Sequence, residues 1–172
     1  GLGLVFNFEM LNFKFSADFF HRLISKIEKD FPRPFMPVYV FSNHDRRRSI
    51  HRIHEDVRKA KLLHLLQLTV RGVPCMYYGE EIGMEDVPIP FERCMDPAAL
   101  QQPALFEIWG RDPERTPMQW DTTLNGGFGN GKPWLPVNEN YKTVNVALED
   151  RDPNSILNYF RKMTKLRKEI DV

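Results

Sequence analysis

Residues 37–42 read PVYVFS, a short apolar run rich in β-branched and aromatic side chains. Two runs of the same kind flank it along the chain, LVFNF at 4–8 and VPCMYYG at 73–79. Continuous apolar runs of this length are typical of strands that are buried on both faces of a parallel sheet. The sequence therefore predicts three buried strands, about 35 residues apart.

A helical pattern follows each of these strands. Ser16 is a predicted N-cap for the first helix, and a leucine-rich segment at 55–70, ended by Arg71 and Gly72, predicts the second. Asp152 followed by Pro153 predicts the start of the third. The apolar residues with helical spacing are Phe19, Phe20, Leu23, Ile24 and Ile27 in the first helix, and Ile156, Leu157, Phe160, Met163 and Leu166 in the third. Alternating strands and helices predict an α/β fold of parallel βαβ units.

A long irregular segment, residues 85–152, delays the third helix. It carries most of the prolines and shows no sustained hydrophobic period. A loop of this length inside a compact domain is typically functional or part of something larger. Three parallel strands alone would also leave both sheet edges bare. We therefore expect the chain to be part of a larger barrel or sheet.

The composition excludes several classes of protein. The chain has 172 residues, of which 42% are hydrophobic and 27% charged, so collagen-like and wholly disordered proteins are excluded. A net charge of +1 gives no general attraction to nucleic acid, and no apolar stretch is long enough for a membrane helix. Two cysteines without CxxC spacing predict neither a disulfide scaffold nor a zinc site, and favour a reduced, cytoplasmic setting. No cofactor and no metal are predicted.

Polar residues come directly after the second strand, as Asn43, His44 and Asp45. In α/β proteins, ligands bind at the carboxyl ends of the strands. Three hydrogen-bonding side chains at this position suit a hydroxylated ligand or a charge near a reaction centre. The alternative is that Asp45 only caps a helix and its neighbours are incidental.

Three motifs give the chain a family resemblance. FSNHD at 41–45, GVPCMYYGEEIGM at 72–84 and GRDPERTPMQWD at 110–121 together resemble the α-amylase superfamily of glycoside hydrolases. The third motif and the residues that follow it, from 127 to 146, are most similar to the α-glucosidase and oligo-1,6-glucosidase branch. The resemblance runs from about residue 4 to residue 168.

The resemblance implies that residues 1–172 are the C-terminal portion of a catalytic (β/α)8 TIM barrel, namely its last three βα units with a long loop before the final helix. It implies that Asp45 is the third catalytic carboxylate, and that His44 and Arg111 bind the sugar. The implied substrate is an α-glucoside or a malto-oligosaccharide. A planar guanidinium at position 111 offers paired donors that a lysine could not supply.

The sequence lacks two features that the family pattern contains. A retaining glycosidase needs a nucleophile and an acid/base, which in this family come from a GxRxD motif and a later glutamate. No GxRxD precedes Asp45, and Glu9 is assigned no catalytic role. We therefore expect a fragment of a retaining α-glucoside hydrolase that is inactive alone and that self-associates through exposed barrel edges. The alternatives are a trehalose synthase or other isomerising transglycosylase, and a non-catalytic binding module derived from the barrel.

For other charged and aromatic residues, both a structural and a functional role are considered. The cluster Arg46–Arg48 predicts a solvated loop, although Arg48 could instead orient Asp45. Trp120 and Trp134 could stack on sugars, but MQWD at 118–121 favours a buried turn. Glu80 and Glu81 follow the third strand, a position from which one of them could face the pocket, but the family resemblance implies structural hydrogen bonds to loops instead of catalysis. His51 to Glu55 predicts a solvated helix start, because the order of its residues is not that of a metalloprotease motif.

Overall fold

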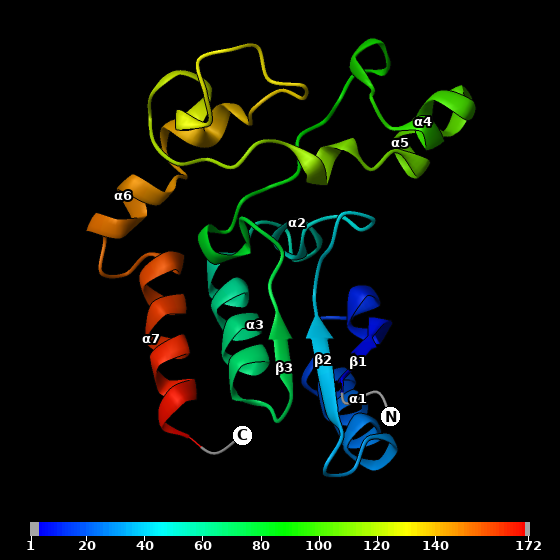
Figure 1. The fold of residues 1–172 in the computed structure, drawn as a ribbon, viewed down its shortest axis with the longest axis vertical. Helices are drawn as coiled ribbons and strands as arrows, with labels where there is room; N and C mark the ends of the chain where they lie inside the picture. The colour runs from blue at the N-terminus through cyan, green and yellow to red at the C-terminus, as the bar shows by residue number, and fades with distance from the viewer. Residues whose placement is uncertain (1–3, 171–172) are drawn as a thin grey trace.

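The computed structural model describes residues 4–170, and they contain a three-stranded parallel sheet (Figure 1). The strands are β1 (Leu4–Asn7), β2 (Met36–Val40) and β3 (Val73–Cys75), in the order β1-β2-β3. Phe6 pairs with Val38 and Val40 pairs with Cys75, both in parallel register. The α/β prediction is confirmed, but each strand is shorter than its apolar run. β3 ends at Cys75 because the chain then turns away towards Gly79, which has a φ of 85°.

The main helices have the predicted order: α1 (Ala17–Asp30), α3 (Val57–Thr69) and α7 (Ile156–Glu169). Ser16 caps α1 as predicted, since its side chain accepts a hydrogen bond from the backbone N–H of Phe19. A short α2 (Ser49–Arg52) precedes α3. The helix predicted from residue 55 begins at Val57 because His54 and Glu55 have φ values of 60° and 54°, and Asp56 is the N-cap.

The predicted start of the last helix is wrong. Ser155, and not Asp152, is the N-cap of α7, and its Oγ accepts a hydrogen bond from Asn158 N at 3.0 Å. Asp152 lies in the turn after α6 (Val146–Arg151), and Pro153 is therefore outside the helix. The carboxylate of Glu149 accepts a hydrogen bond from Leu157 N at 3.0 Å, which fixes where α7 begins.

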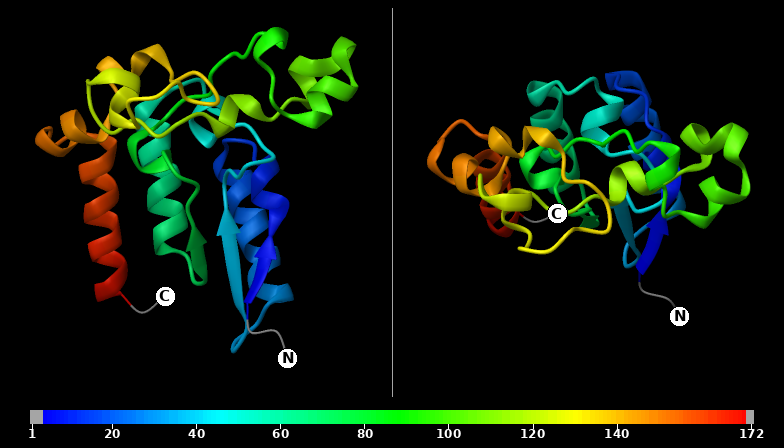
Figure 2. Two further views of the ribbon diagram at one scale, coloured as in Figure 1. Left: turned by 45° about the horizontal axis from the view of Figure 1, so that its top comes forward. Right: turned by 90° about the horizontal axis from the view of Figure 1, so that it is seen from above.

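The helices α1 and α3 pack on one face of the sheet, as the view from above shows (Figure 2). The core joins side chains of β2 and the loop after it to those of the helices; its buried members are Met10, Phe13, Leu23, Ile27, Tyr39, Phe41, Ile50, Ile53, Ala60, Leu63 and Ile156. On β1 and just after it, Leu4, Phe6 and Phe8 alternate with more buried residues and are each more than half exposed. The other face of the sheet is therefore uncovered at β1.

The irregular segment 85–152 lies across the carboxyl ends of the strands (Figures 1 and 2). Its helices α4 (Pro97–Gln101), α5 (Phe106–Trp109) and α6 are all short, which explains the missing hydrophobic period. Short 3-10 turns occupy Phe8–Asn12, Glu80–Ile82, Phe91–Arg93, Pro103–Leu105, Asp112–Arg115, Leu124–Gly127 and Glu139–Lys142. The segment thus forms a cover over the edge of the sheet where ligands bind in α/β proteins.

The solvated-loop reading is wrong for Arg48, whose side chain is fully buried, although Arg46 is exposed. The Arg48 guanidinium donates hydrogen bonds to the carbonyl oxygens of Tyr78 and Glu114, the latter at 2.9 Å, and so does not point at Asp45. An arginine is buried here because it supplies several donors to loop carbonyls that have no helix or sheet partners.

Glu80 has the structural role that the sequence favoured. Its carboxylate accepts hydrogen bonds from Ser42 Oγ, from Ser49 Oγ at 2.8 Å and from Tyr77 N at 2.9 Å. Burial raises the pKa of this carboxyl. Glu80 therefore joins the carboxyl ends of β2 and β3 from beneath the surface.

Candidate active site

Asp45 lies five residues past the end of β2, after the buried Phe41 and Ser42, at the carboxyl edge of the sheet. The side chain of Asn43 accepts a hydrogen bond from Asp45 N at 2.9 Å, which forms a tight turn. This turn directs the Asp45 side chain, which is 46% exposed, out of the core. A carboxylate in this position is open to a ligand.

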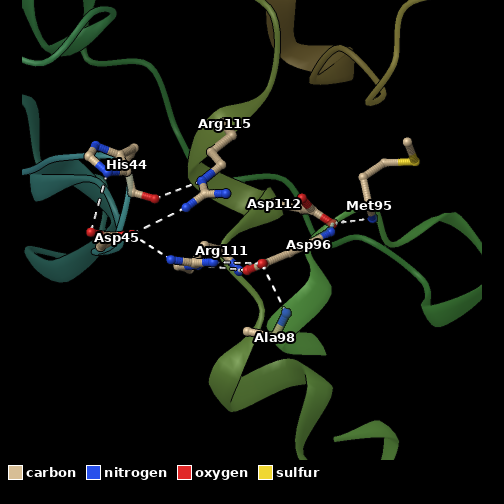
Figure 3. Close-up of polar contacts among 8 residues, drawn as sticks. All are labelled: His44, Asp45, Met95, Asp96, Ala98, Arg111, Asp112 and Arg115. Carbon is tan, nitrogen blue, oxygen red and sulfur yellow. Dashed lines mark hydrogen bonds and ion pairs between the residues drawn. The ribbon is translucent and has the colours of Figure 1, made fainter. Parts of the chain in front are cut away.

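Two arginines from the irregular segment contact Asp45 (Figure 3). Nη1 of Arg111 lies 2.8 Å and Nη2 of Arg115 lies 3.2 Å from the same Asp45 oxygen, Oδ1. His44 Nε2 lies 3.3 Å from the other oxygen, Oδ2. The structure therefore brings together the three residues that the sequence predicted, Asp45, His44 and Arg111, although Arg111 is 66 positions away from Asp45.

Arg115 is a member of this cluster that the sequence analysis missed. Its Nε donates a hydrogen bond to the backbone oxygen of His44 at 2.7 Å, so it holds the backbone and the carboxylate of adjacent residues. The signal that could have found it is spacing, because Arg111 caps and Arg115 ends one four-residue 3-10 turn, Asp112–Arg115. Both side chains therefore project from one short segment of the chain.

Arg111 is itself held by a second carboxylate, that of Asp96 (Figure 3). Nε and Nη2 of Arg111 each donate to one Asp96 oxygen, both at 2.8 Å. The hydrogen bonds from Arg111 lower the pKa of Asp96 far below its usual range, and Asp96, followed by Asp45, raises the pKa of Arg111. Asp96 is fully buried and Arg111 is about one-third exposed, so the pair connects the core to the surface.

An aromatic groove adjoins the cluster. It has a volume of about 420 Å³, and Arg115 forms part of its wall together with Tyr78, Trp120, Phe128 and Trp134. Met118 and Gln119 are buried, as expected for a turn at MQWD, but Trp120 is 51% exposed, so the turn is only partly buried. The half-exposed rings leave open the sugar-stacking reading of Trp120 and Trp134.

A second cavity, of about 430 Å³, is rich in acidic groups. Its lining includes Arg47, Glu85, Asp86, Glu107 and Asp112. Within residues 4–170, no group of three His, Cys, Asp or Glu side chains is arranged to hold a metal ion. The same described part of the chain contains no helix long and apolar enough to cross a membrane.

Comparison with known proteins identifies the family. Residues 5–172 match the family model described as alpha amylase, catalytic domain. The chain belongs to the α-amylase family. The fold neighbours of this α-amylase-family chain include an isomaltulose synthase variant from Erwinia rhapontici, in complex with D-glucose, with a TM-score of 0.85 and 28% identity. A trehalulose synthase from Pseudomonas mesoacidophila has a TM-score of 0.83 and 28% identity, and each match covers 98% of this chain and 36% of the neighbour.

Curated relatives confirm the predicted α-glucosidase branch. The chain is 40% identical over 155 residues to an α-glucosidase of Apis mellifera, which covers 89% of this chain and 27% of that protein. It is 46% identical over 132 residues to a salivary α-glucosidase of Aedes aegypti, with 76% of this chain and 22% of the relative covered. An oligo-1,6-glucosidase of Parageobacillus thermoglucosidasius is 39% identical over 151 residues, with 76% and 27% covered.

The chain therefore spans about a quarter of the length of the curated relatives that it matches. The cytoplasmic location stays a prediction, and relatives from Aedes aegypti and Anopheles gambiae are named salivary α-glucosidases.

Proposed function

We propose that this chain forms the last three βα units of the catalytic barrel of a retaining α-glucoside hydrolase of the α-glucosidase or oligo-1,6-glucosidase type. The substrate would be an α-linked glucoside or a malto-oligosaccharide. One observation carries the proposal: a half-exposed Asp45 carboxylate at the carboxyl end of β2, contacted by Arg111 and Arg115. Those residues lie in two of the three motifs on which the family resemblance depends.

Asp45 is proposed to stabilise the transition state. Glycoside cleavage passes through an oxocarbenium-like state, in which positive charge develops on the sugar ring. The Asp45 carboxylate, which the two guanidinium groups hold in place, attracts that charge and accepts hydrogen bonds from sugar hydroxyls. His44, next to it and 67% exposed, is placed to donate to the same hydroxyls.

Arg111 is proposed to bind the glucose unit in the ground state as well as in the transition state. Three of its five N–H groups are used by Asp96 and Asp45, which leaves one on each terminal nitrogen for a sugar hydroxyl. A donor to a hydroxyl that does not react stabilises both states. Arg111→Ala should therefore raise KM more than it lowers kcat.

The covalent step needs two more carboxyl groups, about 5–5.5 Å apart, as nucleophile and acid/base. We propose that other strands of the complete catalytic barrel supply them, since the chain matches only about a quarter of its relatives. On this account the 172-residue chain alone is inactive.

A hybrid enzyme tests this proposal. In the hybrid, residues 4–170 replace the matching segment of the Parageobacillus thermoglucosidasius oligo-1,6-glucosidase, to which the chain is 39% identical. The expected result is a folded protein that hydrolyses p-nitrophenyl α-glucoside within about tenfold of the parent rate. A hybrid that does not fold, or that folds without activity, contradicts the proposal and favours a non-catalytic module.

The structural neighbours favour a second candidate activity. Isomaltulose and trehalulose synthases match with TM-scores of 0.85 and 0.83, so an isomerising transglycosylase uses the same arrangement of these elements. Product analysis with sucrose separates the two activities. Glucose and fructose as the main products support the hydrolase, and isomaltulose or trehalulose supports the transglycosylase.

A further inference from the structure

We propose that Asp96 is a positioning residue that fixes the guanidinium of Arg111 between Asp45 and the bound sugar. The inference rests on the proposed function of Asp45 and Arg111, and it adds a residue that acts only through Arg111. Asp96 lies beyond hydrogen-bond reach of the open site, because its side chain is fully buried behind Arg111 (Figure 3).

The geometry of the contact fixes Arg111 in orientation as well as in position. Asp96 accepts from Nε and Nη2 along one edge of the guanidinium plane, both at 2.8 Å, and this two-point contact removes rotation about the end of the side chain. Nη1, on the opposite side, then lies 2.8 Å from Asp45. A single contact to Asp45 would leave a long, flexible arginine free to adopt other rotamers.

Asp96 also holds the backbone from which Arg111 projects. Its Oδ2 accepts a hydrogen bond from Arg111 N at 2.9 Å, while its Oδ1 accepts from Ala98 N at 3.2 Å. A reciprocal contact comes from Asp112, whose Oδ2 accepts hydrogen bonds from Met95 N at 2.6 Å and from Asp96 N at 3.0 Å. Each of the two loop segments, 95–98 and 110–112, therefore has a carboxylate that binds the backbone of the other.

The charges of the cluster support the same role. Arg111 and Arg115 carry two positive charges, and Asp45 and Asp96 carry two negative charges, so the four side chains are neutral together. Without the Asp96 charge, both guanidinium groups would be neutralised by Asp45 alone, and Asp45 would attract a positively charged transition state less strongly. Asp96 thereby leaves the Asp45 charge available to the sugar.

A double-mutant cycle in the hybrid enzyme tests the inference, with Asp96→Asn, Arg111→Ala and the double variant. Loss of a charge-assisted hydrogen bond corresponds to about a tenfold effect, so Arg111→Ala should raise KM about tenfold and Asp96→Asn about three- to tenfold. If Asp96 acts through Arg111, the double variant should equal Arg111→Ala within about twofold in both KM and kcat.

Two further variants keep the test decisive. Asp56→Asn is a matched control, because Asp56 also binds an arginine side chain and two backbone N–H groups but caps α3, and it should leave KM unchanged. If Asp96→Asn does not fold, Arg111→Lys removes the two-point contact while it keeps every carboxylate, and it should raise KM as much as Arg111→Ala.

Independent, multiplying effects of Asp96→Asn and Arg111→Ala would overturn the inference, as would an unchanged KM in folded Asp96→Asn or Arg111→Lys. Failure of the proposed function gives a different result, namely an unsubstituted hybrid without activity, or full activity in the hybrid that carries Asp45→Asn.

Discussion

Replacement of Arg48 by methionine should destabilise the folded enzyme strongly, although Arg48 is not proposed to touch substrate. Methionine has a similar length but no donors, so the carbonyl oxygen of Tyr78 would lose its side-chain partner, while that of Glu114 would keep the hydroxyl of Tyr77, at 3.2 Å. The unpaired carbonyl of Tyr78 costs about 1–3 kcal/mol, and the loss of one hydrogen bond at Glu114 costs about 0.5–1.5 kcal/mol. The guanidinium carbon lies 4.6 Å from the ring centre of Tyr78, and loss of this contact adds roughly 0.5–2 kcal/mol. Relief of guanidinium desolvation offsets part of the sum, which leaves about 2–4 kcal/mol.

Thermal unfolding of the hybrid enzyme measures this effect. We expect the melting temperature to fall by roughly 2–3 °C in Arg48→Met, because the entropy of unfolding of a protein as long as the hybrid is about 1.2 kcal/mol/K. Arg46→Met is the matched control, because Arg46 is an exposed residue of the same cluster, and it should shift the melting temperature by less than about 0.5 °C. A shift of less than about 1 °C in Arg48→Met would refute the view that this buried arginine holds the loops together.

Three other predictions concern activity, pH and association. The 172-residue chain should not hydrolyse p-nitrophenyl α-glucoside or maltose, and turnover above the buffer rate that Asp45→Asn abolishes would contradict the missing nucleophile and acid/base. Burial raises the pKa of Glu114 to about 7, whereas an unfolded glutamate has a pKa of about 4.3. The protonated Glu114 side chain therefore contributes its full stabilisation below pH ~4.3, and this stabilisation is lost as the pH rises through about 7. Glu114→Gln should flatten the melting temperature between pH 5 and 8, and a profile as steep as the wild type would count against this. Because Phe6 and Phe8 are exposed, the chain should self-associate in sedimentation velocity experiments. Replacement of both by lysine should lower the sedimentation coefficient. A monodisperse wild-type monomer would contradict the role of these two side chains in association.

The strands and main helices were predictable because their signals are local. The apolar runs at 4–8, 37–42 and 73–79 overlap the three strands, and Ser16 begins a helix whose apolar residues recur at helical spacing. The ends were less predictable because they depend on tertiary contacts. Ser155 begins α7 instead of Asp152 since Glu149, from the preceding helix, binds the first turn.

The site was predictable only in part. His44 and Asp45 come shortly after the apolar run 37–42, so their position at the edge of the sheet could be inferred from the sequence. Arg111 was found through the family resemblance alone. Asp96 and Arg48 could not be found, because a charged side chain reads as exposed until the partner that permits its burial is known. Those partners lie 15 and 66 positions away in the sequence.

The steady-state constants of the hybrid enzyme with Asp45→Asn test the central claim most directly. If Asp45 stabilises the transition state more than the ground state, kcat should fall by about 10²–10³ while KM changes little. The melting temperature of the same variant should stay close to that of the unsubstituted hybrid, because Asp45 is about half exposed. An unchanged kcat together with a lowered melting temperature would contradict the account and leave Asp45 as a structural contact for Arg111 and Arg115.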